Sequence, residues 1–165
     1  MATDSENKTI TVEDTEGRIK AYQAIIEQAR HEIEILDMDL DKKIFDCHDI
    51  YSNIKKTILE SSRAQVRILV HSAHNIIKDG RHLVYLMEKL SSYIELRELH
   101  PDDQQFAKEN IIIADKSAFC RTRNEKPYEG RAELHNVTTA EELLILFNRL
   151  WENASRPTDL LRLHL

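Results

Sequence analysis

The order of hydrophobic periodicities along the chain constrains the fold more than any other feature of the sequence. Segments whose apolar residues recur every three or four positions, as on one helix face, alternate with short runs typical of buried strands. Helices are predicted at 17–30, from Asp49, from Asp79 and from Thr138 or Thr139 up to Pro157, with strands at 32–36, 66–70, 94–99, 111–114, 117–123 and 132–134 and a turn at 127–130. Three successive helix–strand units predict parallel strands, and a hairpin through Asp115-Lys116 adds an antiparallel pair. We therefore expect an α/β domain whose mixed, largely parallel sheet is flanked by helices.

Composition and charge divide the 165 residues into three parts. Residues 1–16 hold five acidic side chains against Lys8 alone and show no periodicity, so we expect a disordered acidic leader. Residues 17–156 are expected to form one folded domain. The leucine-rich residues 157–165 are expected to dock on this domain or on a second subunit, because so many leucines are unfavourable in water.

Several protein classes are excluded by what the chain lacks. Its three glycines lie far apart, so no segment can form the glycine-rich loop that cradles phosphates in nucleotide-binding proteins. No apolar run approaches the roughly 20 residues that cross a bilayer, and the N-terminus is acidic and polar, so we expect no membrane span and a cytoplasmic location. Cys47 and Cys120 are expected to be free thiols.

The charge distribution has one local reversal. The chain carries a formal net charge of −6, whereas residues 116–131 have five basic and two acidic side chains. This segment is interpreted as a solvated hairpin, with recognition of an anionic ligand as the alternative. Nucleic acid is not an expected partner, because residues 17–165 carry a formal charge of −2 and no basic stripe interleaved with aromatic residues.

The second half of the chain resembles the single-repeat phospholipase D-like domain. The resemblance rests on a strand Ile-Ile-Ile-Ala-Asp ending at Asp115, a histidine and proline upstream at His100 and Pro101, and a helix carrying Leu-Phe-x-x-x-Trp up to Trp151. It covers about residues 20–153 and implies a phospholipase D-like sandwich, of a kind found in bacterial proteins. Because single-repeat relatives pair their half-sites, the resemblance also implies a homodimer.

The catalytic motif of that family is degenerate in this sequence. When the aspartate of its His-x-Lys-x-x-x-x-Asp motif is laid on Asp115, Lys108 takes the place of the histidine and Asn110 that of the lysine. The family's Gly-Ser-x-Asn segment falls on residues 122–123, with Asn124 one place from the expected asparagine. In the family an imidazole attacks phosphorus, a task that a protonated lysine cannot perform at neutral pH. The resemblance therefore implies an inactive domain, in which Asp115 is interpreted as a turn residue.

Polar residues at strand ends define a candidate site. Ligands of parallel sheets favour the edge at the carboxyl ends of the strands, and an antiparallel fourth strand would start at that edge. The residues predicted there, as an anion-binding cluster, are His71, His74, His100, Lys108, Asn110, Arg121 and Arg123. Arginine in such a cluster binds phosphate or carboxylate in bidentate fashion. No cofactor or metal is predicted, because His71 and His74 supply only two of the three or four ligands that zinc requires.

Three functional hypotheses follow from these residues. The first is a catalytically inactive phospholipase D-like binding domain that recognises an anionic, phosphate-bearing ligand or a protein partner. The alternative is a divergent phosphodiesterase, or a phosphatidyl- or nucleotidyl-type transferase, that uses His71, His74 or His100 as its nucleophile. The third is a structural subunit whose C-terminal leucines form the interface.

Overall fold

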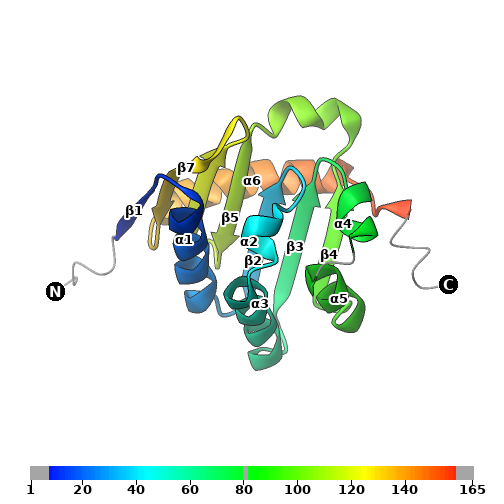
Figure 1. Cartoon of the computed structure of the whole chain (residues 1–165), viewed down its shortest axis with the longest axis horizontal. Helices are drawn as coiled ribbons and strands as arrows, with labels where there is room; N and C mark the ends of the chain where they lie inside the picture. Colours follow the sequence, from blue (N-terminus) through cyan, green and yellow to red (C-terminus); the bar gives the residue numbers. More distant parts are fainter. Residues whose placement is uncertain (1–7, 80–81, 159–165) are drawn as a thin grey trace.

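The computed structural model describes residues 8–79 and 82–158, which form one seven-stranded sheet with helices on both faces (Figure 1). The strands are β1 (Thr9–Val12), β2 (Glu32–Asp37), β3 (Gln65–Val70), β4 (Ile94–Glu98), β5 (Glu109–Ala114), β6 (Ala118–Arg123) and β7 (Lys126–Glu133). The helices are α1 (Thr15–Gln28), α2 (Lys42–Phe45), α3 (His48–Glu60), α4 (His74–Lys78), α5 (His82–Lys89), the 3-10 helix η1 (Pro101–Phe106) and α6 (Val137–Asn153).

The strand order across the sheet is β1-β7-β6-β5-β2-β3-β4. β2, β3 and β4 pair in parallel, as the three helix–strand units predict. The other four of the six pairings are antiparallel. The mixed, helix-flanked α/β sheet is therefore confirmed, but it is less parallel than predicted, because β5, β6 and β7 form a meander and β1 adds a further antiparallel strand.

The sheet separates two hydrophobic cores. One face packs against α1, α2, α3 and α5 through residues such as Ile33, Ile35 and Ile68. The other face is covered by α6, whose Phe147 and Leu150 pack on residues that alternate with the first set. Figure 1 shows α6 crossing behind the sheet while the shorter helices lie in front. Residues on neighbouring positions of one strand therefore face different layers.

The N-terminal leader is not disordered where the structure describes it. Thr9–Val12 form β1, which pairs with β7, and α1 already begins at Thr15 with Asp14 as its N-cap. The prediction of a disordered leader over residues 1–16 is thus wrong for residues 9–16, and residues 1–7 lie outside the described part. The four-residue strand has β-branched side chains and a buried Val12, but it is too short to give a periodicity above its acidic surroundings.

Three predicted helix starts are also corrected. The N-cap of α6 is Asn136, whose Oδ1 accepts a hydrogen bond from the backbone N–H of Thr139 at 3.1 Å. Thr138 and Thr139, the predicted caps, instead lie within the first turn. Asp79 is the C-cap of α4, a helix that the sequence did not predict, and Asp49 lies in the first turn of α3. Each predicted cap is a polar residue close to the true helix end.

The predicted turn at residues 127–130 is part of β7. The chain reverses earlier, at residues 124–125, and Gly130 pairs with Thr122 of β6. A Cβ at Gly130 would lie 2.0 Å from the carbonyl oxygen of Arg121. Glycine is needed at residue 130 because the two strands approach too closely for a side chain.

The end of the chain is described as far as residue 158. α6 ends at Asn153, and Ser155 forms an isolated bridge with Glu98 at the β4 edge. Residues 159–165 lie outside the described part, so the predicted docking of the leucine-rich tail remains a prediction. No helix among the described residues is long and apolar enough to cross a membrane. Cys47 and Cys120 are free thiols, as predicted, and burial raises the pKa of Cys120 to about 12.

Candidate functional site

The carboxyl ends of β2, β3 and β4 meet the start of β5 and the end of β6 at one edge of the sheet, the upper edge in Figure 1. A cavity of about 530 Å³ opens there, which we call the edge pocket. It is lined by Arg18, Asp37, Met38, Asp39, Asp41, Lys43, His71, Ser72, Asn110, Asn124, Pro127 and Tyr128. The cavity lies where ligands of parallel sheets are expected.

A buried ion pair lies in the wall of the edge pocket. Arg18 of α1 places its Nη2 2.6 Å from Oδ2 of Asp37, the last residue of β2, and both side chains are almost fully buried. The same Nη2 donates to the hydroxyl of Tyr22 at 3.1 Å. Oδ1 of Asp37 accepts the backbone N–H of Leu40 at 3.0 Å. The Arg18 charge is therefore compensated within the protein and is not free to hold a ligand anion.

His71 is the one predicted histidine that lines the edge pocket. It follows β3, and its Nε2 lies 3.1 Å from the carbonyl oxygen of Ala107. Because a carbonyl only accepts, Nε2 must carry the hydrogen, and in the neutral ring Nδ1 then has the lone pair. Burial lowers the pKa of His71, which favours this neutral form.

Two asparagines complete the wall nearest to β5 and β6. Oδ1 of Asn110 accepts the backbone N–H of Met38 at 3.2 Å, and its Nδ2 donates to Oγ1 of Thr122 at 3.4 Å. Asn110, at the position of the family's lysine, therefore joins three strands at this edge. Nδ2 of Asn124 donates to the carbonyl of Ala107 at 2.8 Å, whereas its buried Oδ1 has no partner in the described structure.

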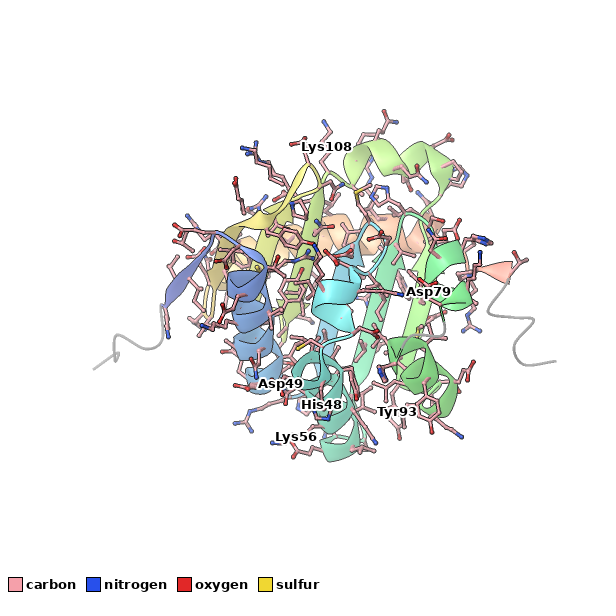
Figure 2. All side chains as sticks on the ribbon, in the orientation of Figure 1. His48, Asp49, Lys56, Asp79, Tyr93 and Lys108 are labelled. Carbon is pink, nitrogen blue, oxygen red and sulfur yellow. The ribbon has the colours of Figure 1, made fainter. Side chains whose placement is uncertain are left out.

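The other predicted residues at this edge lie outside the edge pocket. His74 starts α4 and is exposed. His100 is the N-cap of η1, and its Nδ1 accepts a backbone N–H at 3.1 Å. Lys108 is exposed and lies at the upper edge of the molecule (Figure 2). Of the seven predicted residues, the structure brings only His71 and Asn110 into this pocket.

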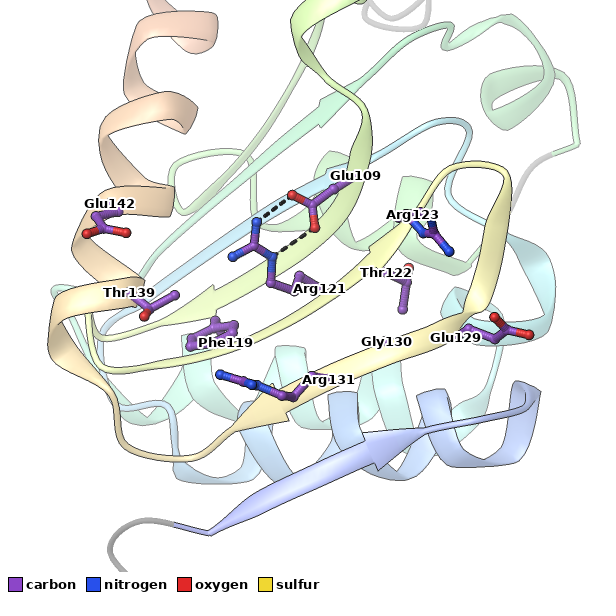
Figure 3. A pocket seen from close by; sticks show the side chains of 10 residues that line it. All are labelled: Glu109, Phe119, Arg121, Thr122, Arg123, Glu129, Gly130, Arg131, Thr139 and Glu142. Atoms are coloured by element: carbon purple, nitrogen blue, oxygen red, sulfur yellow. Dashed lines mark hydrogen bonds and ion pairs between the residues drawn. The ribbon is translucent and has the colours of Figure 1, made fainter.

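Arg121 and Arg123 lie on the opposite face of the sheet. They line a second cavity of about 520 Å³, here named the arginine groove, together with Glu109, Phe119, Thr122, Glu129, Gly130, Arg131, Thr139 and Glu142 (Figure 3). Side chains alternate along a strand, so Arg121 and Arg123 face the α6 layer while Thr122 reaches Asn110 on the other side. The predicted seven-residue cluster is therefore divided by the sheet.

The arginines of the groove differ in how they are engaged. Nε and Nη2 of Arg121 donate to the two carboxylate oxygens of Glu109 at 2.8 and 2.6 Å, and these hydrogen bonds raise the pKa of Arg121 (Figure 3). Arg131 donates through Nη2 to Glu133 at 2.8 Å. Within residues 8–79 and 82–158, no ion pair engages the guanidinium of Arg123. Nη1 of Arg121 and most of Arg123 and Arg131 remain available as donors.

The electrostatics of the edge pocket are the reverse of the predicted ones. Three aspartates, Asp37, Asp39 and Asp41, line it against the two cations Arg18 and Lys43. With His71 neutral, the formal charge of the lining is therefore −1. Sequence reasoning missed Arg18 and Tyr128. The signal for Arg18 was its position four residues before Tyr22, on the apolar stripe of the first helix.

Asp115 is a turn residue, as its interpretation from the sequence proposed. Its φ is 48°, in the left-handed region. Its carboxylate accepts the backbone N–H groups of Arg30, His31 and Glu32 at 2.7, 3.0 and 2.9 Å. These bonds join the β5–β6 hairpin to the α1–β2 connection, at the end of the sheet opposite to the edge pocket. No group of three or more histidine, cysteine or acidic side chains suited to a metal occurs among the described residues.

Comparison with solved structures gives the class of the fold. Nuc from Salmonella typhimurium, a phospholipase D family member, matches with a TM-score of 0.61 and 18% sequence identity, over 92% of this chain and 99% of that chain. NucT from Helicobacter pylori matches with a TM-score of 0.60 and 13% identity, over 92% and 98%. The protein therefore has a phospholipase D-like fold, which confirms the predicted resemblance.

The family is given by the sequence itself. Residues 14–163 match the model of a family described as a domain of unknown function, DUF7931, and the chain belongs to that family. TrmBL2, an archaeal chromatin protein with a novel mode of DNA binding, is also similar in structure, with a TM-score of 0.64 and 17% identity. That match covers 95% of this chain but only 57% of TrmBL2. No curated protein sequence matches the chain significantly.

Proposed function

We propose that the chain is a catalytically inactive phospholipase D-like domain that binds an anionic, phosphate-bearing ligand. The observation that carries the first part is the use of Asn110. It stands where the family has a catalytic lysine, and its amide is hydrogen-bonded to Met38 and Thr122 within the protein. The histidine position is taken by Lys108, which is exposed and cannot act as a nucleophile while protonated.

His71 is a poor replacement for the missing nucleophile. Its ring has a lone pair on Nδ1, but a phosphodiester beside it would need cations to stabilise the negative charge that develops on phosphorus. Arg18 is paired with Asp37, and the carboxylates of Asp39 and Asp41 add repulsion. A phosphate would therefore be disfavoured in the edge pocket both as a substrate and as a transition state.

The arginine groove is the better place for an anion. Glu109 holds the Arg121 guanidinium in a fixed orientation and leaves Nη1 unused, while Arg123 and Arg131 approach from the same strand and its neighbour. Guanidinium groups arranged in this way suit phosphate or carboxylate oxygens. The anion can belong to a small molecule or be presented by a protein partner, and both sources would use the same donors.

The binding part of the proposal is tested by ligand-induced stabilisation. Pyrophosphate is expected to raise the unfolding temperature of the full chain, because a ligand that binds only the folded state stabilises it. The double variant Arg123→Gln/Arg131→Gln should abolish this shift. Arg63→Gln, an exposed position outside the groove, is the matched control and should retain it. A pyrophosphate shift that persists in the double variant, or no shift at all, would contradict the assignment of the groove.

The catalytic part is tested by turnover. The purified chain is expected to leave bis(p-nitrophenyl) phosphate unchanged over long incubation. Release of nitrophenol that disappears in His71→Ala would establish the alternative, a divergent phosphodiesterase. A DNA oligonucleotide belongs in the same binding series, because TrmBL2 is a DNA-binding protein of similar fold. The formal charge of −6 leads us to expect no DNA-induced shift.

A further inference from the structure

The edge pocket contains two buried polar atoms without a partner. They are Nε of Arg18 and Oδ1 of Asn124. The other donors of both groups are accounted for, since Arg18 bonds Asp37 and Tyr22 through Nη2, and Asn124 bonds Ala107 through Nδ2. Nearly all buried polar atoms in folded proteins are hydrogen-bonded, so such atoms beside a cavity indicate a missing partner.

The two atoms have opposite requirements. Nε of Arg18 is a donor and needs an acceptor, whereas Oδ1 of Asn124 is an acceptor and needs a donor. A hydroxyl group offers both functions, which neither an ammonium nor a fully ionised phosphate does. The remaining free positions around the pocket, Nδ1 of His71 and the spare lone pairs of Asp41, are further acceptors for hydroxyl hydrogens.

The charges around the edge pocket select against ions of either sign. The formal charge of −1 on its lining disfavours phosphate and carboxylate. An organic cation would meet Lys43, whose Nζ already lies 5.5 Å from the centre of the Tyr128 ring. Tyr128 and Asp41 are joined by a short hydrogen bond, so this carboxylate is already partly engaged. An uncharged ligand avoids both repulsions.

The size and walls of the pocket suit a small polar molecule with a carbon skeleton. The volume of about 530 Å³ lies within the range of ligand sites. Met38, Pro127 and the Tyr128 ring give apolar surface beside the polar atoms. A sugar or cyclic polyol has this combination, with C–H groups on its faces and hydroxyls around its rim.

We propose that the edge pocket binds a small uncharged polyhydroxyl compound, a sugar or cyclic polyol, through Arg18 and Asn124. The site is separate from the arginine groove, and it differs in chemistry from the phosphate site of the phospholipase D family. Binding requires no reaction and no cofactor. The two proposals are independent, because each can fail while the other holds.

The test uses the full chain, labelled with ¹⁵N and titrated with D-ribose and with myo-inositol. The expected result is a set of saturable amide shifts centred on Met38, His71 and Asn124. Asn124→Leu should weaken binding about tenfold, the effect of one lost hydrogen bond to a buried group. The control Asn75→Leu, an exposed position on α4, should bind as the wild type does.

Further arms separate the competing explanations. Met38→Trp, at a wall residue that is 42% exposed, narrows the pocket without burying new polar atoms and should abolish the shifts even if Asn124→Leu fails to fold. D-ribose 5-phosphate and putrescine should each bind more weakly than D-ribose. Tighter binding of either ion would overturn the assignment of an uncharged ligand. Unperturbed pocket amides with both polyols would mean that water alone satisfies Arg18 and Asn124.

Discussion

Glu34 carries a buried carboxyl group whose ionisation should limit stability near neutral pH. It lies on β2 on the α6 face of the sheet, and its side chain is 2% exposed. The nearest cation is Arg67, with Nη2 3.8 Å from Oε2, while Oε1 has no hydrogen-bond partner in the described structure. Burial raises the pKa of Glu34 from 4.5 to about 7, and the charge of Arg67 only partly opposes this effect.

We predict that Glu34→Gln stabilises the protein in a pH-dependent manner. A carboxyl whose pKa is higher in the folded state favours folding most below pH 4.5, and this contribution is lost as the pH rises through 7. Glutamine cannot ionise and does not suffer that loss. At 1.36 kcal/mol per pKa unit, the variant should be more stable than the wild type by about 1 kcal/mol at pH 5 and about 3 kcal/mol at pH 8.

The assay is equilibrium unfolding in urea at pH 5 and pH 8. The single tryptophan, Trp151 on α6, gives a fluorescence signal close to the affected layer, since Arg67 lies over its ring. Glu141→Gln, an exposed position on the same helix, is the control and should leave the wild-type pH profile unchanged. A stability difference for Glu34→Gln that is the same at both pH values, or that favours the wild type at pH 8, would refute this reasoning.

Other substitutions test the contacts that hold the sheet together. Asp115→Ala removes the acceptor of three backbone N–H groups and should lower the free energy of unfolding by about 2–4 kcal/mol in urea titrations. Asn136→Ala removes the α6 N-cap and should cost about 1 kcal/mol in the same assay. Gly130→Ala places a Cβ against the Arg121 carbonyl and should lower the melting temperature more than Asn136→Ala does. Light scattering should give the mass of a homodimer, and a monomer at high concentration would contradict the expectation drawn from the family.

The layered fold was predictable because its long elements have clear periods. The stripe of α1 and the alternation in β2 and β3 each extend over several residues, and the residues that break them are polar. β1 was not predictable in this way, because four residues give too short a pattern and its partner β7 is more than 110 residues away. The boundary errors at Asp79 and Thr138 arose because several neighbouring polar residues could each cap a helix.

The candidate site was predictable by edge but not by face. The sequence placed Asn110 and Arg123 at the same end of neighbouring strands, and the register confirms that position. It did not separate Arg121 and Arg123 from His71, because that separation depends on which side of the sheet each residue occupies. The acidic character of the edge pocket comes from the β2–α2 connection, whose aspartates were interpreted as caps. Charge counted along the chain therefore differed from charge gathered in space.

The role of Asp115 has a consequence for how the family motif is interpreted. The carboxylate accepts three backbone N–H groups that belong to a connection 83 to 85 residues away in sequence. Loss of this aspartate would expose three unpaired donors whether or not the protein ever meets a phosphodiester. Selection for folding alone is enough to retain it. An aspartate in this position therefore reports on the architecture of a phospholipase D-like domain, and only its histidine and lysine neighbours report on catalysis.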